Sequence, residues 1–108
     1  MEDFGFHEMQ AIQRELQEKY RDKWPPLSPE NGRSTLLWML SEAGEIADVI
    51  KKKGDRRIVE DEAVRRHFVE EMCDVMMYFN DLMICYGITP EELRQIYLEK
   101  HRKNMERW

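Results

Sequence analysis

The sequence predicts an all-α protein, a four-helix bundle completed by oligomerisation. Apolar residues recur every three or four positions along most of the chain, and no stretch shows the two-residue alternation of a strand. Charged residues make up 36% of the chain and apolar residues 42%, a balance that suits amphipathic helices better than disorder. At 108 residues we expect one domain spanning 1–108, with a high surface-to-volume ratio that self-association would offset.

The first helix is expected over residues 6–23. Apolar side chains from Met9 to Tyr20 lie at helical spacing between polar ones. The segment 24–32 must end this helix, because it holds three prolines and a glycine. We expect it to form an ordered loop on the surface.

Two long helices should follow the loop. Ser34 and Thr35 are both good N-caps for a second helix that runs to Lys53, with Gly54 just past its end. A third helix is expected over residues 60–86, before another glycine. Each of these helices carries one of the acid pairs described below.

The fourth helix has the clearest start signal in the chain. Thr89 suits the N-cap position, Pro90 the first helical position and Glu92 the third, which together make a capping box. We expect this helix to extend to about Glu106. Four helices joined by short connections predict a bundle in which facing helices build the functional site.

Charge and composition exclude several classes of protein. The formal net charge of −5 argues against binding a nucleic acid polymer or an anionic membrane surface. The chain has no basic and apolar leader pattern at its start and no apolar run long enough for a bilayer. Two cysteines, Cys73 and Cys85, lie too far apart on one helix to pair, so we expect a reduced, cytoplasmic setting.

Two pairs of carboxylates interrupt apolar runs and are the most informative feature of the chain. They read Glu42-x-x-Glu45 and Glu71-x-x-Asp74. Residues three apart on a helix lie on one face, so each pair can direct two acids to one place, and two facing helices would bring four together. A hard divalent cation would offset the resulting repulsion. We therefore predict a metal site made of these four residues.

The acid pairs are expected to lie off the main core faces of their helices, beside Trp38 and Tyr78. The helix that carries Tyr78 is apolar almost all round from residue 68 to residue 86. Such a helix is normally buried on more than one side, and in so short a chain the second cover is expected to be another subunit. The sequence thus predicts a homodimer or homotetramer.

All-oxygen ligation favours Mg²⁺, with Mn²⁺ as the other option. A di-iron site would need Glu-x-x-His on its helices, which this chain lacks. Since Mg²⁺ usually keeps waters and bridges to a substrate's phosphates, a phosphate-bearing substrate is expected. The phosphate-binding patterns G-x-x-x-x-G-K-[ST] and G-x-G-x-x-G are absent. Asp48 and Asp81 continue the two acid stripes and are weaker candidates for a second metal.

The paired motif resembles the signature of the MazG-like, all-α nucleoside triphosphate pyrophosphohydrolases, which is ExxE followed after a spacer of this size by ExxD. The resemblance is strong over the second and third helices and extends into the fourth, where Lys100, Asn104 and Arg107 resemble the family's K-x-x-x-N-x-x-R tail. Many members carry a further glutamate directly before the first motif acid. This chain has Ser41 there instead.

The resemblance implies a MazG-like bundle and Mg²⁺-dependent hydrolysis of a nucleoside triphosphate, or a deoxynucleotide, to the monophosphate and pyrophosphate. Mg²⁺ on the acids would bind phosphates and lower the pKa of an attacking water, with one carboxylate as general base. The alternative is a non-catalytic helical subunit that binds nucleotide or metal. The implied residues are, for catalysis and metal, Glu42, Glu45, Glu71 and Asp74, and, for substrate, Lys100, Asn104, Trp38, Tyr78 and Arg107.

Overall fold

The computed structural model describes residues 4–107, and these form α-helices and one short 3₁₀ helix, with no strand among them. The prediction of an all-α protein is therefore confirmed. In chain order the elements are α1 (Phe6–Lys19), η1 (Pro29–Asn31), α2 (Gly32–Lys53), α3 (Asp55–Glu60), α4 (Glu62–Cys85) and α5 (Pro90–Arg107).

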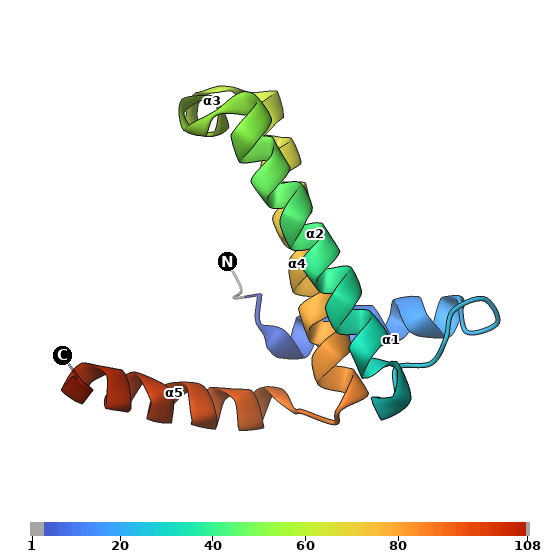
Figure 1. The fold of residues 1–108 in the computed structure, drawn as a ribbon. Coiled ribbons are helices and arrows are strands. Elements are labelled where there is room, and N and C mark those ends of the chain that lie inside the picture. Colours follow the sequence, from blue (N-terminus) through green and yellow to red (C-terminus); the bar gives the residue numbers. More distant parts are fainter. Residues whose placement is uncertain (1–3, 108) are drawn as a thin grey trace.

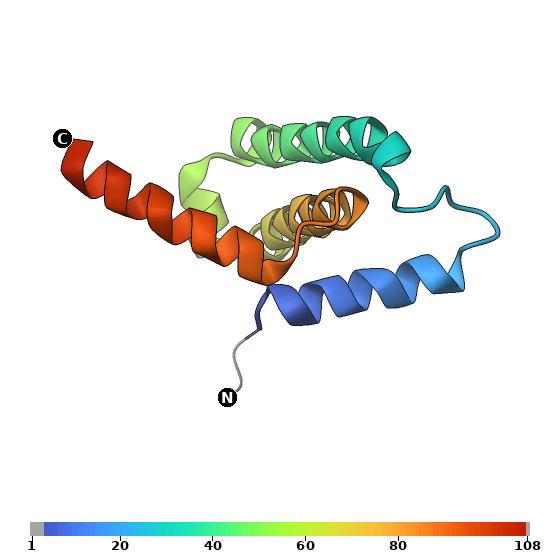
Figure 2. The same ribbon diagram turned by 90° about the horizontal axis from the view of Figure 1, so that it is seen from below.

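The long helices α2 and α4 run side by side and form an arm, with α3 at its tip (Figure 1). Helix α1 crosses the base of this arm and packs mainly on α4. Helix α5 leaves the base in another direction and projects away from the other helices (Figures 1 and 2). A closed four-helix bundle is thus not formed by the described residues of one chain.

The first helix is shorter than predicted, because it ends at Lys19 and not at residue 23. The following residues fold into turns in which the ring of Trp24 stacks on that of Tyr20, with the ring centroids 4.6 Å apart. The loop is ordered, as expected. The side-chain amide of Gln17 donates to the Pro25 carbonyl, and that of Asn31 donates to the Pro26 carbonyl.

The predicted third helix corresponds to α4, and the residues before it, for which no helix was predicted, form the short helix α3, so the described chain has five α-helices rather than four. The break falls at Asp61, whose backbone is extended and whose carboxylate accepts hydrogen bonds from the amides of Ala63 and Val64. This is an N-cap, and it starts α4. The predicted ends at Gly54 and Gly87 are confirmed, since both glycines have positive φ, 85° and 66°.

Little of the apolar surface is buried within the chain. Among the described residues, the buried apolar side chains are Val49, Val64, Met83 and Cys85. The apolar arc of α2 that was expected to form its core face is largely exposed, with Leu40 at 54%. The α4 arc is also partly exposed, with Met72 at 49%. The face of α2 that packs on α4 is instead the one that carries Glu42.

Polar side chains occupy the contact between α1 and α4. Gln10 and Gln13 are buried, whereas Ile12, which the sequence pattern places in the core, is 42% exposed. Asn80 on α4 is completely buried; its side-chain amide donates to the Met76 carbonyl, and its side-chain oxygen has no partner. Polar groups thus take part in this contact, and the Gln13 side-chain amide donates across it to the Asp81 carboxylate.

None of the described helices is long and apolar enough to cross a membrane. Both cysteines are free thiols, Cys73 exposed and Cys85 buried, and burial raises the pKa of the Cys85 thiol. The Cys85 thiol is therefore not activated as a nucleophile, since a reactive cysteine needs a lowered pKa.

Candidate metal centre

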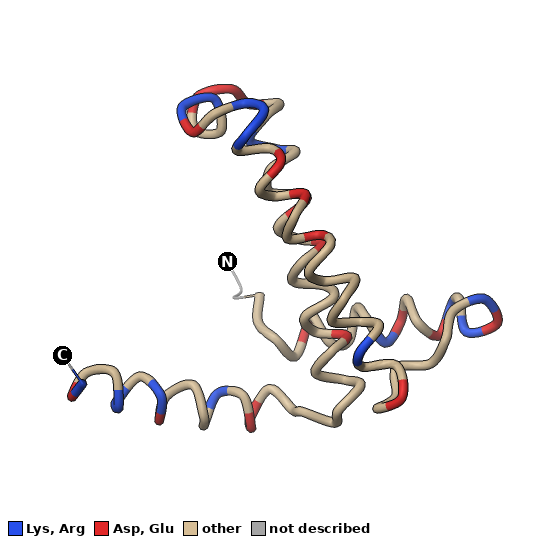
Figure 3. Tube along the Cα trace, viewed as in Figure 1, with Lys and Arg blue, Asp and Glu red and all other residues tan. Residues whose placement is uncertain are grey.

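Three of the four motif carboxylates converge between the two helices of the arm. Glu42 on α2 and Glu71 and Asp74 on α4 each offer one oxygen atom, and these oxygens lie within 4.8 Å of one another. That separation allows one cation to touch all three. Figure 3 shows acidic residues along the middle of the arm, and both basic and acidic residues at its tip and along α5.

Helical spacing explains the convergence. Glu71 and Asp74 lie one turn apart on α4, and the α2 face that meets them includes Thr35, Glu42 and Val49, which follow one another at intervals of two helical turns. Thr35 and Val49 are buried, so Glu42 sits midway along the packed face of α2. The acids therefore lie on the contact face between the two helices. The sequence pattern had instead indicated faces away from the main core face of each helix.

Glu45 does not join the group of converging oxygens and is exposed. It is nevertheless close enough to affect Glu42. Partial burial raises the pKa of the Glu42 carboxyl, and the negative charges of Asp74, Glu71 and Glu45 raise it further. Ionisation of Glu42 beside the other acids is thus disfavoured, and a bound divalent cation would favour its ionised form. The donor set, carboxylate oxygens alone, fits Mg²⁺ or Mn²⁺.

One histidine faces the cluster. Nε2 of His67 lies 3.6 Å from Oε1 of Glu71, one turn away on the same helix. The Glu71 side chain is 15% exposed, so its rotamer is restricted by its surroundings. A histidine in this position can fix the orientation of a metal-binding carboxylate without itself contacting the metal.

A cleft of about 460 Å³ opens beside the acid cluster and shares Asp74 with it. Its walls come from the second half of α1, the proline loop, the start of α2 and the middle of α4. Most of the surface is apolar or aromatic, with a few amides and carboxylates, which is the usual character of a small-molecule site. The residues that line the cleft include Gln13, Trp24, Trp38, Asp74, Tyr78 and Asp81.

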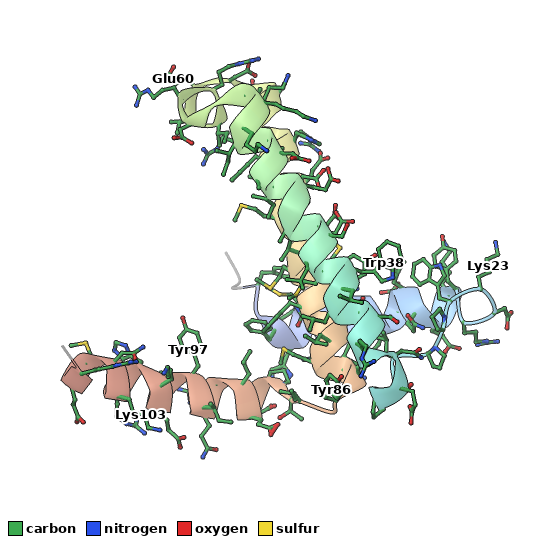
Figure 4. The ribbon with its side chains drawn as sticks, viewed as in Figure 1. Lys23, Trp38, Glu60, Tyr86, Tyr97 and Lys103 are labelled. Carbon is green, nitrogen blue, oxygen red and sulfur yellow. The ribbon has the colours of Figure 1, made fainter. Side chains whose placement is uncertain are left out.

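Two predicted substrate residues line this cleft. Trp38 projects from α2 on the side where the second half of α1 and the proline loop lie (Figure 4). Tyr78 stands one turn after Asp74 on α4, and burial together with the charges of Glu42, Asp81 and Asp74 raises the pKa of its phenol. Tyr78 therefore stays a neutral hydrogen-bond donor at physiological pH.

Three predicted substrate residues are not brought to the cluster within the chain. Lys100, Asn104 and Arg107 all lie on α5, which projects away from the arm (Figure 1). Asp48, the weaker metal candidate on α2, is not among the converging ligands either. The acid cluster and the basic helix are thus separate parts of one chain.

The sequence reasoning missed the polar wall of the cleft. Gln13 is 5% exposed and donates a hydrogen bond of 2.9 Å to Asp81, across the contact between α1 and α4. Burial raises the pKa of the Asp81 carboxyl, and the hydrogen bond from Gln13 lowers it by less. Glutamines on a helix normally face water, so the sequence alone does not indicate that Gln13 lines the cleft. Its position on the packed face of α1 shows this.

No protein-family model matches the chain, and no curated protein or solved structure matches it either. These comparisons do not identify the family that the two acid motifs resemble. Function is therefore argued from the residues of the cluster and the cleft.

Proposed function

We propose that the protein is a Mg²⁺-dependent pyrophosphohydrolase that converts a nucleoside or deoxynucleoside triphosphate to the monophosphate and pyrophosphate. The observation that carries the proposal is the shared position of Asp74, which belongs both to the acid cluster and to the aromatic cleft beside it. A ligand with a charged and a flat apolar part would meet both features at once.

The charged part of such a ligand would be a triphosphate. An acidic cluster cannot bind phosphates directly, because the charges repel each other. Mg²⁺ bound at the cluster would offset this charge, polarise phosphate oxygens and lower the pKa of a bound water. Glu42, Glu71 and Asp74 supply the oxygen ligands for that ion, and Glu45 is placed to adjust the charge around it.

The flat part would be the base, held in the cleft. Trp24 and Trp38 line it from the loop and from α2, and their rings can stack on any base. Tyr78 lines the cleft one turn after Asp74, where its hydroxyl would be available to a sugar or an α-phosphate. With the base in the cleft and the phosphates at the metal, the bond to be cut would lie next to the acid cluster.

The chemistry required of the chain is modest. A water attacks the α-phosphorus, the bond between that phosphorus and the bridging oxygen breaks, and pyrophosphate leaves. A carboxylate of the cluster that accepts the water's proton would act as general base, and the raised pKa of Glu42 makes this residue the best candidate. The pyrophosphate product is what separates this reaction from ordinary phosphate release.

We also propose that the working form is a homo-oligomer. Many large apolar side chains are exposed on the two helices of the arm, among them Leu36, Leu37 and Leu40 on α2 and Val69, Met72 and Met76 on α4. Exposed apolar patches of this kind often mark protein interfaces. Two arms packed face to face would bury these side chains and form a four-helix core.

The function is tested by incubating the purified protein with a panel of nucleoside and deoxynucleoside triphosphates and Mg²⁺, and by measuring pyrophosphate and orthophosphate separately. Pyrophosphate and monophosphate in equal amounts are expected. The rate of the Glu71→Gln variant should be at least 100-fold lower than that of wild type, whereas the Glu70→Gln variant should keep the wild-type rate. Release of orthophosphate alone would overturn the proposal, and Mg²⁺-dependent binding without turnover would support the non-catalytic alternative.

A further inference from the structure

Three amide side chains that line the aromatic cleft turn their nitrogen toward the protein. They belong to Gln13, Gln17 and Asn31. The Gln13 amide donates to the Asp81 carboxylate at 2.9 Å, and the other two donate to carbonyls of the proline loop at 2.6 and 2.7 Å. Carbonyl and carboxylate oxygens only accept hydrogen bonds, so the nitrogen end of each amide must face its partner. Each amide therefore keeps its oxygen for other contacts.

The oxygens that are left over are hydrogen-bond acceptors without a partner. None of the described residues donates to the side-chain oxygen of Gln13, Gln17 or Asn31, or to the second oxygen of Asp81. These oxygens are not sealed from water, because within residues 4–107 the buried side-chain atom that lacks a partner belongs to Asn80. The polar wall of the cleft, made of these three amides and Asp81, thus presents acceptors.

Asp81 is the strongest acceptor of the polar wall because it can carry a charge. Burial raises the pKa of its carboxyl, since water solvates the ionised form only in part. The described residues that line the cleft include no lysine, arginine or histidine that could pair with it. A ligand that fills the cleft would take the remaining water from the free Asp81 oxygen. That ligand must then supply a donor, because a buried acceptor without a partner is costly.

The edge of a nucleobase decides whether it can supply this donor. Cytosine and adenine each carry an exocyclic amino group, which has two N–H donors. Uracil and hypoxanthine have a carbonyl oxygen in its place, and this oxygen would be repelled by the Asp81 carboxylate. A site whose polar groups are satisfied by one ligand rejects the analogue that leaves them unpaired. The polar wall therefore favours the amino-bearing member of each pair.

We propose that Asp81 and the side-chain oxygen of Gln13 recognise the exocyclic amino group of a nucleobase, so that the protein selects nucleotides with an amino-bearing base over their carbonyl counterparts. Trp24 and Trp38 would hold the plane of the base, since stacking tolerates any base, and the polar wall would select by its edge. Asp81 is then a specificity-determining residue and not a ligand of a second metal. The inference rests on the proposed function for the identity of the ligand as a nucleotide.

The selectivity is tested without metal or phosphate, by titrating nucleosides against tryptophan fluorescence in a chelating buffer at neutral pH. Two pairs differ by an amino group in place of a carbonyl oxygen: deoxycytidine and deoxyuridine, and deoxyadenosine and deoxyinosine. In each pair the amino-bearing nucleoside should bind to wild type roughly 10- to 100-fold more tightly, the expected effect of an unpaired buried acceptor. Equal affinities within both pairs would overturn the proposal.

The Asp81→Asn variant assigns this selectivity to one side chain. Asparagine has one side-chain oxygen, which the Gln13 amide takes, so an NH₂ donor replaces the free Asp81 oxygen. Deoxyuridine and deoxyinosine should then bind at least as tightly as their amino-bearing counterparts. Glu70→Gln is the matched control, because it removes a charge from an exposed position of α4 outside the cleft and should keep the wild-type preference. A preference that Asp81→Asn leaves unchanged would also overturn the proposal.

Turnover separates a role in selectivity from a role in metal binding. With Mg²⁺ present, Asp81→Asn should lower the kcat/KM of deoxycytidine triphosphate relative to that of deoxyuridine triphosphate by roughly tenfold or more. An equal loss for both substrates would identify Asp81 as a ligand of a second metal and would overturn the proposal. If the wild type itself shows no turnover, the proposed function fails while nucleoside binding still decides the selectivity of the cleft.

Discussion

The side-chain amide of Gln13 on α1 donates a hydrogen bond of 2.9 Å to the carboxylate of Asp81 on α4, in the wall of the aromatic cleft. The same two helices also meet through Met9 and Asn80 and through the edge-on rings of Phe6 and Phe79. Because a partly buried carboxylate is costly to ionise, this link has a pH dependence of its own.

Replacing Asp81 with asparagine should raise stability at neutral pH. Burial raises the pKa of the Asp81 carboxyl in the folded chain. The contribution of Asp81 to folding stability is therefore fully present at pH values below its ordinary pKa near 4, and it is lost as the pH rises through the raised pKa of the folded chain. Asp81→Asn keeps an acceptor for Gln13 without the charge, so its melting temperature should exceed that of wild type by a few degrees at pH 7. Near pH 3.5 the two should converge; a pH-independent difference would contradict this account.

The acid cluster should destabilise the metal-free protein. Glu71→Gln removes one of three converging charges, so in a chelating buffer this variant should melt at a higher temperature than wild type. Adding Mg²⁺ should not raise the melting temperature of the variant further. Wild type should gain about 2.7 kcal/mol at a Mg²⁺ concentration of about 100 times its dissociation constant.

Glu70→Gln is the matched control for this change. Glu70 is exposed and pairs with Arg66 at 3.2 Å, away from the cluster, so its loss should cost about 0.5 kcal/mol or less and leave the Mg²⁺ response intact. An equal Mg²⁺ response in wild type and Glu71→Gln would argue against a cation at the cluster.

Local signals in the sequence predicted most helix ends, because caps act within one turn. Gly54, Thr89 and Pro90 are examples, and the start of α4 at the Asp61 cap lies within two residues of the predicted start, whereas the short helix α3 before it was not predicted. Burial was harder to predict. The apolar arc of α2 indicates that something covers it, but the pattern cannot distinguish the chain itself from a partner, and so Glu42 was placed on the wrong face.

The convergence of Glu42, Glu71 and Asp74 was predictable, since spacing fixes which residues share a helix face. The cleft was predictable only in part. Its aromatic residues Trp38 and Tyr78 lie close to the acid motifs in the sequence. Gln13 and Asp81, by contrast, come together because α1 crosses α4, and no local sequence pattern encodes that crossing.

Gly32 is required by the side chain of Tyr86. Its backbone is ordinary right-handed helix, with φ −62° and ψ −41°, so alanine suits the conformation, but an added Cβ would overlap the phenol ring of Tyr86. Gly32→Ala should therefore destabilise the fold by about 1–3 kcal/mol, the range for overpacking. The measurement is chemical denaturation. Adding Tyr86→Ala should restore most of the loss, and a failure to do so would remove Tyr86 as the cause.

Leu40 tests the oligomer without disturbing the single chain. It is 54% exposed on the apolar face of α2, so Leu40→Asp should leave helix content unchanged but place a charge in the proposed interface. We expect a shift to monomer in sedimentation velocity, with at least a tenfold weaker association. Ser41→Asp, about 100° round the same helix, should keep the wild-type mass. Equal masses for wild type and Leu40→Asp would place the interface elsewhere.

The cleft should bind a base even without metal or phosphate. Trp24 and Trp38 line it, so a nucleoside that stacks there should quench tryptophan fluorescence in a chelating buffer. Base stacking on an aromatic side chain is worth about 1–3 kcal/mol, and Trp38→Ala should therefore weaken binding by about tenfold. Ribose 5-phosphate, which has no base, should leave the fluorescence unchanged. Equal quenching by the two ligands would place the base outside the cleft, because only the nucleoside can stack.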